Sequence, residues 1–368
     1  MKRDLFICNS VYQVLVALWL VYMKGKDTPS DIILSDHMNN SESIAERLKD
    51  AGVFQKVYCV KSFDFARFRI RQTKKERICM SIFPNQFLRK FVVLSDVYSS
   101  LYAANMDNFT SLVLNALAHK KQDVKFYIFE DGMFTYSRLF EQDYRNTYIP
   151  VNGIIKKMLH ALIYRNKTIF GNVDGMFVFN PDNMFWHPTF KVEKMAKISR
   201  CDANFRSICN CVFGYNEYCD TYDRKYIFLE EAFYAEGNPV NDLEVIEAFA
   251  GLVGKENIMV KIHPRNPVNR FRQLGYKTNE NTSIPWEVIL MNVGEITDSI
   301  LVTVSSSAAL NPILIFGMDI QVRSIYNCVD HAHSHSRLLA GEIWKVTHSM
   351  FEKYSDKVKM CKCIEEIM

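Results

Sequence analysis

Several patterns that mark common protein classes are missing from this chain of 368 residues. No strand is followed by a Gly-x-Gly-x-x-Gly turn, which argues against a nicotinamide-dependent oxidoreductase. The net charge of +4 comes without a long basic stripe, so we expect no nucleic-acid partner. The apolar stretch 5–23 is interrupted at 9–10 and 12–13, and no cleavage site follows it. We therefore expect neither a signal peptide nor a transmembrane helix.

The ten cysteines also lack the arrangements that would give them a special role. A chain this long does not need a disulfide framework, and several cysteines lie in apolar runs as small buried side chains. The cluster Cys201, Cys209, Cys211 and Cys219 has no Cys-x-x-Cys pair, so we expect no structural zinc. This cysteine usage suits a reducing cytoplasm.

What is present is the composition of a well-packed globular protein, with 48% hydrophobic and 23% charged residues. Strand-like and helix-like segments alternate, which predicts an α/β fold with parallel, doubly wound sheets. The predicted strands are 5–8, 31–35, 56–60, 91–95, 124–129, 175–179, 226–229, 258–262, 301–304 and 320–324.

The alternation is interrupted once, which predicts two domains. The first spans 1–190 and carries the candidate acids described below. An irregular inter-domain region follows at 191–224, and a second alternating domain spans 225–336. The last segment, 337–368, has a helical pattern, and we expect it to pack back toward the first domain.

His263 is the best placed candidate for chemistry. It follows the apolar run 257–262, and Pro264 then stops the strand because proline has no N–H to donate. Ligands of open α/β sheets bind at the carboxyl ends of the strands, so His263 could contact a phosphate there. The alternative is a hydrogen-bonded histidine with a structural role.

A second candidate is the sequence Glu130-Asp131-Gly132, which ends another apolar strand. Adjacent side chains point in different directions, so one carboxylate can face a cleft while the other anchors a loop. A carboxylate in the cleft could accept a proton as a general base. The alternative is an ordinary strand followed by a capped helix.

Two helix starts complete the set. Ser305, Ser306 and Ser307 follow the strand 301–304, and hydroxyls at such a position suit either anion binding or simple capping. Glu287 lies after Pro285 and Trp286 in the first turn of a predicted helix. It could accept hydrogen bonds from ribose, or it could only complement the helix dipole.

The order acid-acid-Gly, His-Pro, Pro-x-Glu, Ser-Ser resembles that of the bacterial sialyltransferases. The sequence looks most similar to glycosyltransferase family 52, the lipooligosaccharide and capsule sialyltransferases, and more distantly to family 80 and to the family 38 polysialyltransferases. The resemblance spans about 4–330. The opening segment 7–13 is also similar to the family 52 start.

The resemblance implies a GT-B fold, in which two Rossmann-like domains face a central cleft. It implies an inverting sialyltransferase that uses CMP-sialic acid and a galactose-type acceptor of a capsule or lipooligosaccharide, with an α-2,3 linkage. No cofactor and no metal would be required, and the sequence has no Asp-x-Asp motif with a clear cleft position.

The same resemblance assigns roles to residues. Glu130 would be the base, although this chain has Glu first where many relatives have Asp, so Asp131 stays an alternative. His263 would stabilise the leaving phosphate. The other implied donor-side residues are Pro264, Arg265, Trp286, Glu287, Ser305, Ser306 and Ser307; on the acceptor side they are Asn9, Ser10, Gln13 and Gly132.

Two other functions compete with this one: a related transferase with a UDP-hexose donor, and a non-catalytic sugar-binding relative. The expected partners are a nucleotide-sugar donor and a glycan acceptor, with a homodimer as the expected assembly. Basic residues interleaved with aromatics in 67–75 could touch an anionic membrane surface or form a solvated helix face. The expected location is the cytoplasm, peripherally at the inner face of the plasma membrane.

Overall fold

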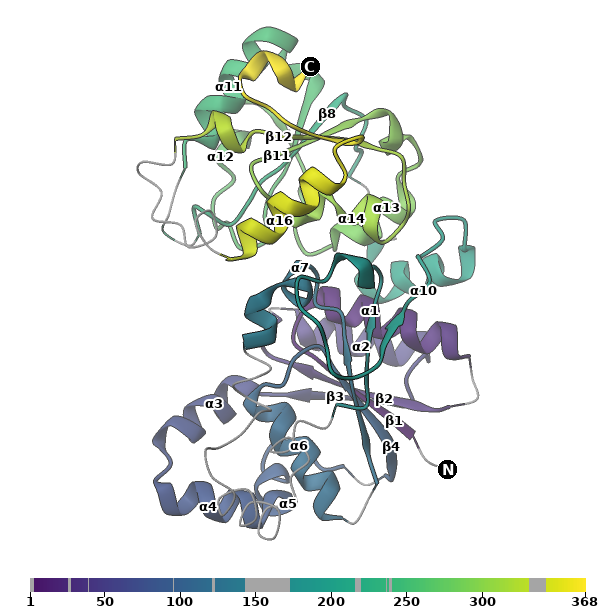
Figure 1. Ribbon diagram of the computed structural model, residues 1–368. Helices are drawn as coiled ribbons and strands as arrows, with labels where there is room; N and C mark the ends of the chain where they lie inside the picture. The colour runs from purple at the N-terminus through teal and green to yellow at the C-terminus, as the bar shows by residue number, and fades with distance from the viewer. Residues whose placement is uncertain are drawn as a thin grey trace. The chain divides into compact units, whose positions relative to one another are not determined.

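The chain folds into two compact units, Met1–Met195 and Ala196–Met368. The computed structural model describes residues 3–25, 28–38, 40–94, 96–120, 123–142, 173–215, 220–235, 237, 240–330 and 342–368. Each unit contains one twisted sheet with helices packed around it (Figure 1). The predicted α/β class is confirmed.

The sheet of the first unit has the strand order β3-β2-β1-β4-β5-β6-β7, and every neighbouring pair is parallel. Its strands are β1 (Arg3–Cys8), β2 (Ser30–Ser35), β3 (Lys56–Val60), β4 (Tyr98–Ala103), β5 (Lys125–Phe129), β6 (Gly175–Val178) and β7 (Val192–Lys194).

The sheet of the second unit follows the same plan, with the order β10-β9-β8-β11-β12-β13 and parallel pairing throughout. Its strands are β8 (Tyr226–Leu229), β9 (Ile258–Lys261), β10 (Lys277–Thr278), β11 (Ile300–Thr303), β12 (Gln321–Ser324) and β13 (Val358–Met360).

Helices connect the strands of both sheets. In the first unit they are α1 (Val11–Lys24), α2 (Ser41–Ala51), α3 (Ser62–Arg71), α4 (Lys74–Ile82), α5 (Pro84–Leu88), α6 (Asn108–His119), α7 (Met133–Tyr136) and the 3-10 helix η2 (Pro181–Asn183). In the second unit they are α10 (Ala203–Phe213), α11 (Asp242–Val253), α12 (Arg270–Gln273), α13 (Trp286–Asn292), α14 (Asn311–Leu314), α16 (Glu342–Lys353) and the 3-10 helices η4 (Lys255–Asn257), η5 (Gly294–Asp298), η6 (Ser307–Ala309), η7 (Tyr326–Cys328) and η8 (Ile364–Ile367).

Helix α1 shows how the local sequence sets these elements. The Ser10 side chain accepts a hydrogen bond from the Gln13 N–H and so caps the start of the helix. The helix ends at Gly25, whose φ of 72° favours glycine. Residues 13–21 between them are buried, which explains why the run 5–23 is so apolar. Within the described part of the chain, no helix is both long and apolar enough to cross a membrane.

The fourth predicted strand was wrong. We expected a strand at 91–95, but β4 is Tyr98–Ala103 and pairs with both β1 and β5. The apolar run before it follows α5 instead. There Phe91 packs edge to face on Phe65, while Val93 is 62% exposed. A short apolar run does not by itself distinguish a strand from a loop that covers a helix.

The end of the chain also differs from the prediction. After α16, residues Val358–Met360 form β13, the edge strand that pairs with β12. Cys361 and Ile367 are fully buried in the core of the second unit, beside Phe249 of α11. The segment expected to be helical is therefore partly a strand of the second sheet. The expected inter-domain region 191–224 contains β7 and α10.

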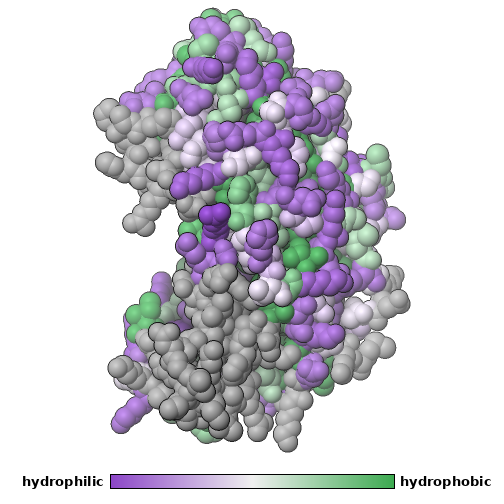
Figure 2. Space-filling model, in the orientation of Figure 1, coloured by the Kyte–Doolittle hydropathy of each residue, from purple (hydrophilic) through white to green (hydrophobic). Residues whose placement is uncertain are grey.

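Both sheets reverse their strand order at a central strand, between β1 and β4 in one unit and between β8 and β11 in the other. At such a switch point the neighbouring loops leave in opposite directions, which creates a crevice at the carboxyl ends of the strands. Elsewhere on the second unit, Figure 2 shows mostly hydrophilic side chains on the visible face. The switch points are therefore the expected ligand sites of the two sheets.

Candidate active site

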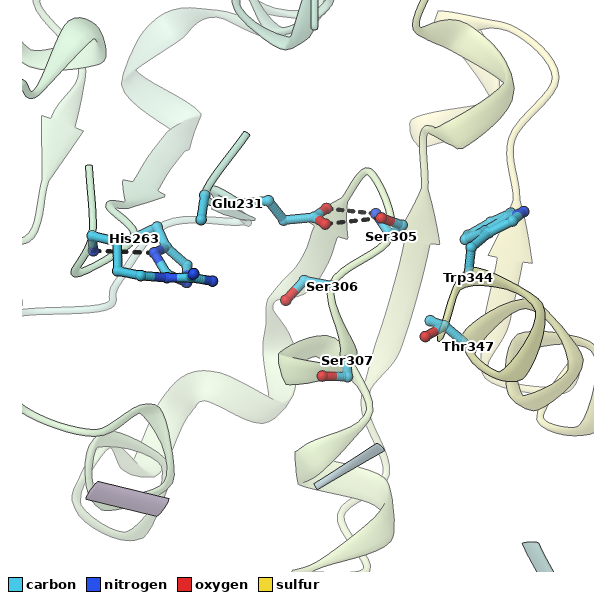
Figure 3. Close-up of a pocket in the computed structure, with 9 residues that line it drawn as sticks. Glu231, His263, Ser305, Ser306, Ser307, Trp344 and Thr347 are labelled. Carbon is cyan, nitrogen blue, oxygen red and sulfur yellow. Dashed lines mark hydrogen bonds between the residues drawn. The ribbon is translucent and has the colours of Figure 1, made fainter. Parts of the chain in front are cut away.

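A pocket of about 150 Å³ lies at the switch point of the second unit (Figure 3). It gathers residues from loops after β8, β9 and β11 together with one face of α16. The lining residues are Glu231, Ala232, His263, Arg265, Ser305, Ser306, Ser307, Trp344 and Thr347. Five of the residues named from the sequence, His263, Arg265 and the three serines, thus meet in one place.

His263 enters this pocket as a neutral hydrogen-bond donor. Its Nδ1 accepts a hydrogen bond from the Arg265 N–H at 3.2 Å, so the ring proton lies on Nε2. Burial, followed by the nearby charges of Arg265 and Lys261, lowers the pKa of His263 to about 4. At neutral pH the ring can donate from Nε2 without carrying a positive charge.

The three serines are not equivalent. Both the N–H and the hydroxyl of Ser305 donate to the carboxylate of Glu231, at 2.6 and 2.8 Å. The Ser306 hydroxyl caps η6 by accepting from the Ala308 N–H, which leaves its own proton available. Among the described residues, the Ser307 hydroxyl has no hydrogen-bond partner. In this structure Ser306 and Ser307 can therefore donate to a ligand, whereas Ser305 is occupied.

Glu231 was not singled out from the sequence. It follows Glu230 after the end of β8, and it lies between His263 and the serine loop in Figure 3. Burial raises the pKa of Glu231 to about 7, although the bonds from Ser305 and Thr303 act in the opposite direction. The available signal was an acid pair, Glu230-Glu231, at the end of an apolar strand, the same pattern as Glu130-Asp131.

Helix α16 forms one side of the pocket, which the sequence did not predict. Trp344 and Thr347 line the pocket, and Trp344 stacks on Tyr326 with ring centroids 3.7 Å apart. The helix itself was predicted, but nothing in its sequence indicated which neighbour its aromatic face would meet.

The predicted residues Pro264, Trp286 and Glu287 do not line this pocket. Glu287 does lie in the first turn of α13, but it is only 6% exposed and accepts a hydrogen bond from Asn311. The Trp286 indole N–H donates to the carbonyl of Ala308, in the helix that the serines begin. These two side chains thus form hydrogen bonds with η6 and α14, the two helices that follow the serine loop, and do not enter the pocket.

The acid pair of the first unit lies at the end of β5, beside the switch point between β1 and β4. Both oxygens of Glu130 are occupied: Oε1 accepts from the Tyr12 hydroxyl at 2.8 Å, and Oε2 accepts from the Phe179 N–H at 2.8 Å and from the Tyr136 hydroxyl. Burial raises the pKa of Glu130 to about 7, despite these three donors. Glu130 is thus hydrogen-bonded to α1, to α7 and to the segment that follows β6.

Asp131 is more accessible than Glu130. It is partly exposed, and the Gln13 amide donates to its carboxylate. Burial raises the pKa of Asp131 above its ordinary value, and that hydrogen bond acts against the increase. Gly132, with a φ of 61°, then turns the chain into α7. Of the two acids, Asp131 is the one that is partly exposed.

The remaining candidates surround this acid pair. The Asn9 N–H donates to the Gln13 side chain at 2.7 Å, and the Asn9 amide donates to Asp107 at 2.9 Å. Ser10 caps α1. The side chain of Gln13 thus links the Asn9 loop to Asp131. In the described ranges, no group of three His, Cys, Asp or Glu side chains could hold a metal ion.

Comparison with known proteins gives one family. The model of a family described as alpha-2,8-polysialyltransferase (POLYST) matches residues 4–322. No curated protein matches the chain. The relationship to sialyltransferases expected from the motifs is therefore confirmed.

Solved structures show the fold. An alpha/beta-galactoside alpha-2,3-sialyltransferase from the luminous marine bacterium Photobacterium phosphoreum is 11% identical, with a TM-score of 0.51, over 100% of this chain and 99% of that one. A UDP-GlcNAc 2-epimerase from Methanocaldococcus jannaschii is 12% identical, with a TM-score of 0.47, over 96% of this chain and 92% of that one. The predicted GT-B fold with two Rossmann-like domains is confirmed.

Proposed function

Since the chain belongs to the alpha-2,8-polysialyltransferase family, we propose that it transfers sialic acid from CMP-sialic acid to a glycan acceptor with inversion. The observation that carries this proposal is the convergence of His263, Ser306 and Ser307 on one pocket at the switch point of the second unit. Neutral donors at such a crevice suit the phosphate of a nucleotide-sugar.

In the proposed reaction an acceptor hydroxyl attacks the anomeric carbon of the sialic acid. Its proton passes to Asp131, the new C–O bond forms, and the bond from the anomeric carbon to the phosphate oxygen breaks. The electron pair of that bond stays with the departing CMP. His263 Nε2–H, Ser306 and Ser307 donate to the phosphate as this charge develops.

The preference for Asp131 over Glu130 rests on their hydrogen bonds. Glu130 already accepts three hydrogen bonds and is only 3% exposed, which leaves little of its carboxylate open to an acceptor hydroxyl. Burial raises the pKa of both acids, so the pKa shifts do not distinguish them as bases. Glu130 then holds the loop that presents Asp131.

For the acceptor we propose a galactose-type terminus of a capsule or lipooligosaccharide, joined through an α-2,3 linkage. The description of the matching family favours a second candidate, an acceptor that ends in sialic acid and is extended through an α-2,8 linkage. Incubating the protein with CMP-sialic acid and either lactose or sialyllactose, then identifying the product linkage by NMR, separates the two. Transfer to neither, with hydrolysis of the donor also absent, would contradict both.

Two measurements test the donor and the role of His263. CMP should raise the melting temperature more than UDP, because the proposed donor is CMP-sialic acid. A UDP-hexose transferase would show the reverse order. Replacing His263 with Ala should lower kcat about 10²-fold, as for loss of one donor to a developing oxyanion. His263→Gln, which keeps an N–H near the Nε2 position, should retain more activity. Equal activity of His263→Ala and wild type would remove His263 from the mechanism.

We also propose that the protein works in the cytoplasm and contacts the membrane through α3–α5. Residues 61–90 contain nine basic and two acidic residues, a charge of +7 against +4 for the whole chain. Among them Phe63, Ile70 and Phe83 are 46%, 79% and 51% exposed. Exposed apolar side chains among basic ones suit an anionic lipid surface.

Vesicle flotation tests this contact. The protein should float with vesicles that contain phosphatidylglycerol and should not float with phosphatidylcholine alone. Ile70→Ser should weaken the binding, whereas Leu252→Ser, at an exposed apolar position of the second unit, should not. Equal binding to both kinds of vesicle, or to neither, would contradict the contact.

A further inference from the structure

Two consecutive acids after β8 hold two different loops of the pocket. Glu230 Oε2 accepts a hydrogen bond from the His263 backbone N–H at 3.1 Å. Glu231 accepts from Ser305 through both of its oxygens. Strand β8 lies between β9 and β11, so the dipeptide that follows β8 lies between the loop after β9 and the loop after β11. One dipeptide can therefore reach the histidine loop on one side and the serine loop on the other.

Glu230 is itself firmly held. Its Oε1 accepts from the Arg270 guanidinium at 3.0 Å, and the same guanidinium contacts Asp242 of α11 at 3.0 Å. Both carboxylates are buried. On the next strand the Ile262 N–H donates to Asn279 at 2.6 Å. The backbone on either side of the Ile262–His263 bond is thus anchored from two directions.

Glu231 is held differently. Its partners are the N–H and hydroxyl of Ser305 and, at 3.3 Å, the hydroxyl of Thr303. Among the described residues it forms no ion pair. A carboxylate beside a phosphate site repels the ligand when it is ionised, and here hydrogen bonds are its only compensation. We therefore expect the hydrogen bonds of Glu231 to fix the conformation of the serine loop, and we expect its negative charge to contribute nothing to ligand binding.

We propose that Glu230 and Glu231 are positioning residues that set the separation between the His263 ring and Ser306-Ser307. They would thereby determine how well the donor phosphate fits. This inference rests on the proposed function, in which that phosphate binds in this pocket. Neither acid needs to touch the substrate, and Glu231 should act through its hydrogen bonds and not through its negative charge.

A pair of variants at Glu231 separates shape from charge. In Glu231→Gln the amide oxygen can still accept from the Ser305 N–H, and the amide NH₂ can donate to the Ser305 hydroxyl, which turns to accept. Glu231→Ala removes both bonds. We expect Glu231→Gln to bind CMP within about threefold of wild type, because two bonds to the loop survive, and Glu231→Ala to bind at least about tenfold more weakly.

The experiment uses the full chain and calorimetric titration with CMP. Asp223→Asn is the control: it is an acid of the same unit whose carboxylate contacts Lys277 and neither pocket loop, and it should bind CMP like wild type. Ser305→Ala breaks the hydroxyl bond to Glu231 from the other side, so it tests the same contact if Glu231→Ala does not fold. It should bind CMP more weakly than wild type, and binding as tight as wild type would contradict the inference if Glu231→Ala does not fold.

Hydrogen exchange of the amides at 303–310, measured without ligand, gives a second readout. Exchange should be faster in Glu231→Ala and unchanged in Glu231→Gln. The inference fails if Glu231→Ala binds CMP as tightly as wild type, or if Glu231→Gln is as impaired as Glu231→Ala. Absence of CMP binding by the wild-type protein would instead contradict the proposed donor, and the exchange measurement would still test the positioning.

Discussion

At the scale of single residues, the two acids of the first unit differ in what already occupies their carboxylates. Replacing Asp131 with Asn should lower kcat about 10²- to 10⁴-fold, because it removes the proton acceptor. Glu130→Gln should cost less than about tenfold, since the amide can still bond to the Tyr12 and Tyr136 hydroxyls. Initial rates with saturating donor measure both. A larger loss for Glu130→Gln, at wild-type melting temperature, would reverse the assignment.

Glu130 also gives a pH dependence of stability. Its pKa is about 7 in the folded protein and 4.5 without the influence of the fold. The folded state therefore binds the proton more tightly, and this contribution to stability is complete below pH 4.5 and lost as the pH rises through 7. The melting temperature of Glu130→Gln relative to wild type should rise between pH 5 and pH 8. A constant difference would mean that Glu130 titrates normally.

The motifs located most of these residues but not their roles. A strand end followed by His-Pro or by two acids places side chains at the binding edge, because strand ends share that edge. The sequence does not show which hydrogen bonds form there. For that reason Ser305 was expected to meet the phosphate but is bound to Glu231, and Glu231 itself was not predicted.

At the scale of elements, η8 closes the core of the second unit. Ile367 is fully buried beside α11, so Ile367→Ala should lower the free energy of unfolding by about 2–5 kcal/mol. Met368 is 57% exposed, and Met368→Ala should change the free energy of unfolding by less than about 0.5 kcal/mol. Urea unfolding measures both. Equal effects would mean that the end of the chain is not part of this core.

Buried apolar strands were easier to predict than short strands that contain charged residues. β1, β2, β8, β9 and β11 are buried runs of apolar residues, which parallel sheets require on both faces. The edge strands β7, β10 and β13 are only two or three residues long, and each contains at least one charged residue. Their pairing depends on a neighbouring strand already in place, which local sequence does not encode.

At the scale of the whole molecule, the pocket is built from one unit alone. CMP should therefore slow hydrogen exchange at the ends of β8, β9 and β11 in the full chain, through His263 and the serine loop. Mass spectrometry of peptides from both units measures this. Protection confined to the acid-pair loop after β5, with residues 305–307 unchanged, would contradict the placement of the donor.

The shared strand order has a consequence for how the protein is made. β1 pairs with β2 on one side, but its other partner is β4, so that Asp4 lies opposite Ser100. During synthesis one edge of β1 therefore stays unpaired until β4 has been made. Long-range parallel pairing of this kind folds slowly. We expect refolding yields to fall with increasing protein concentration and to recover when a chaperone covers that edge.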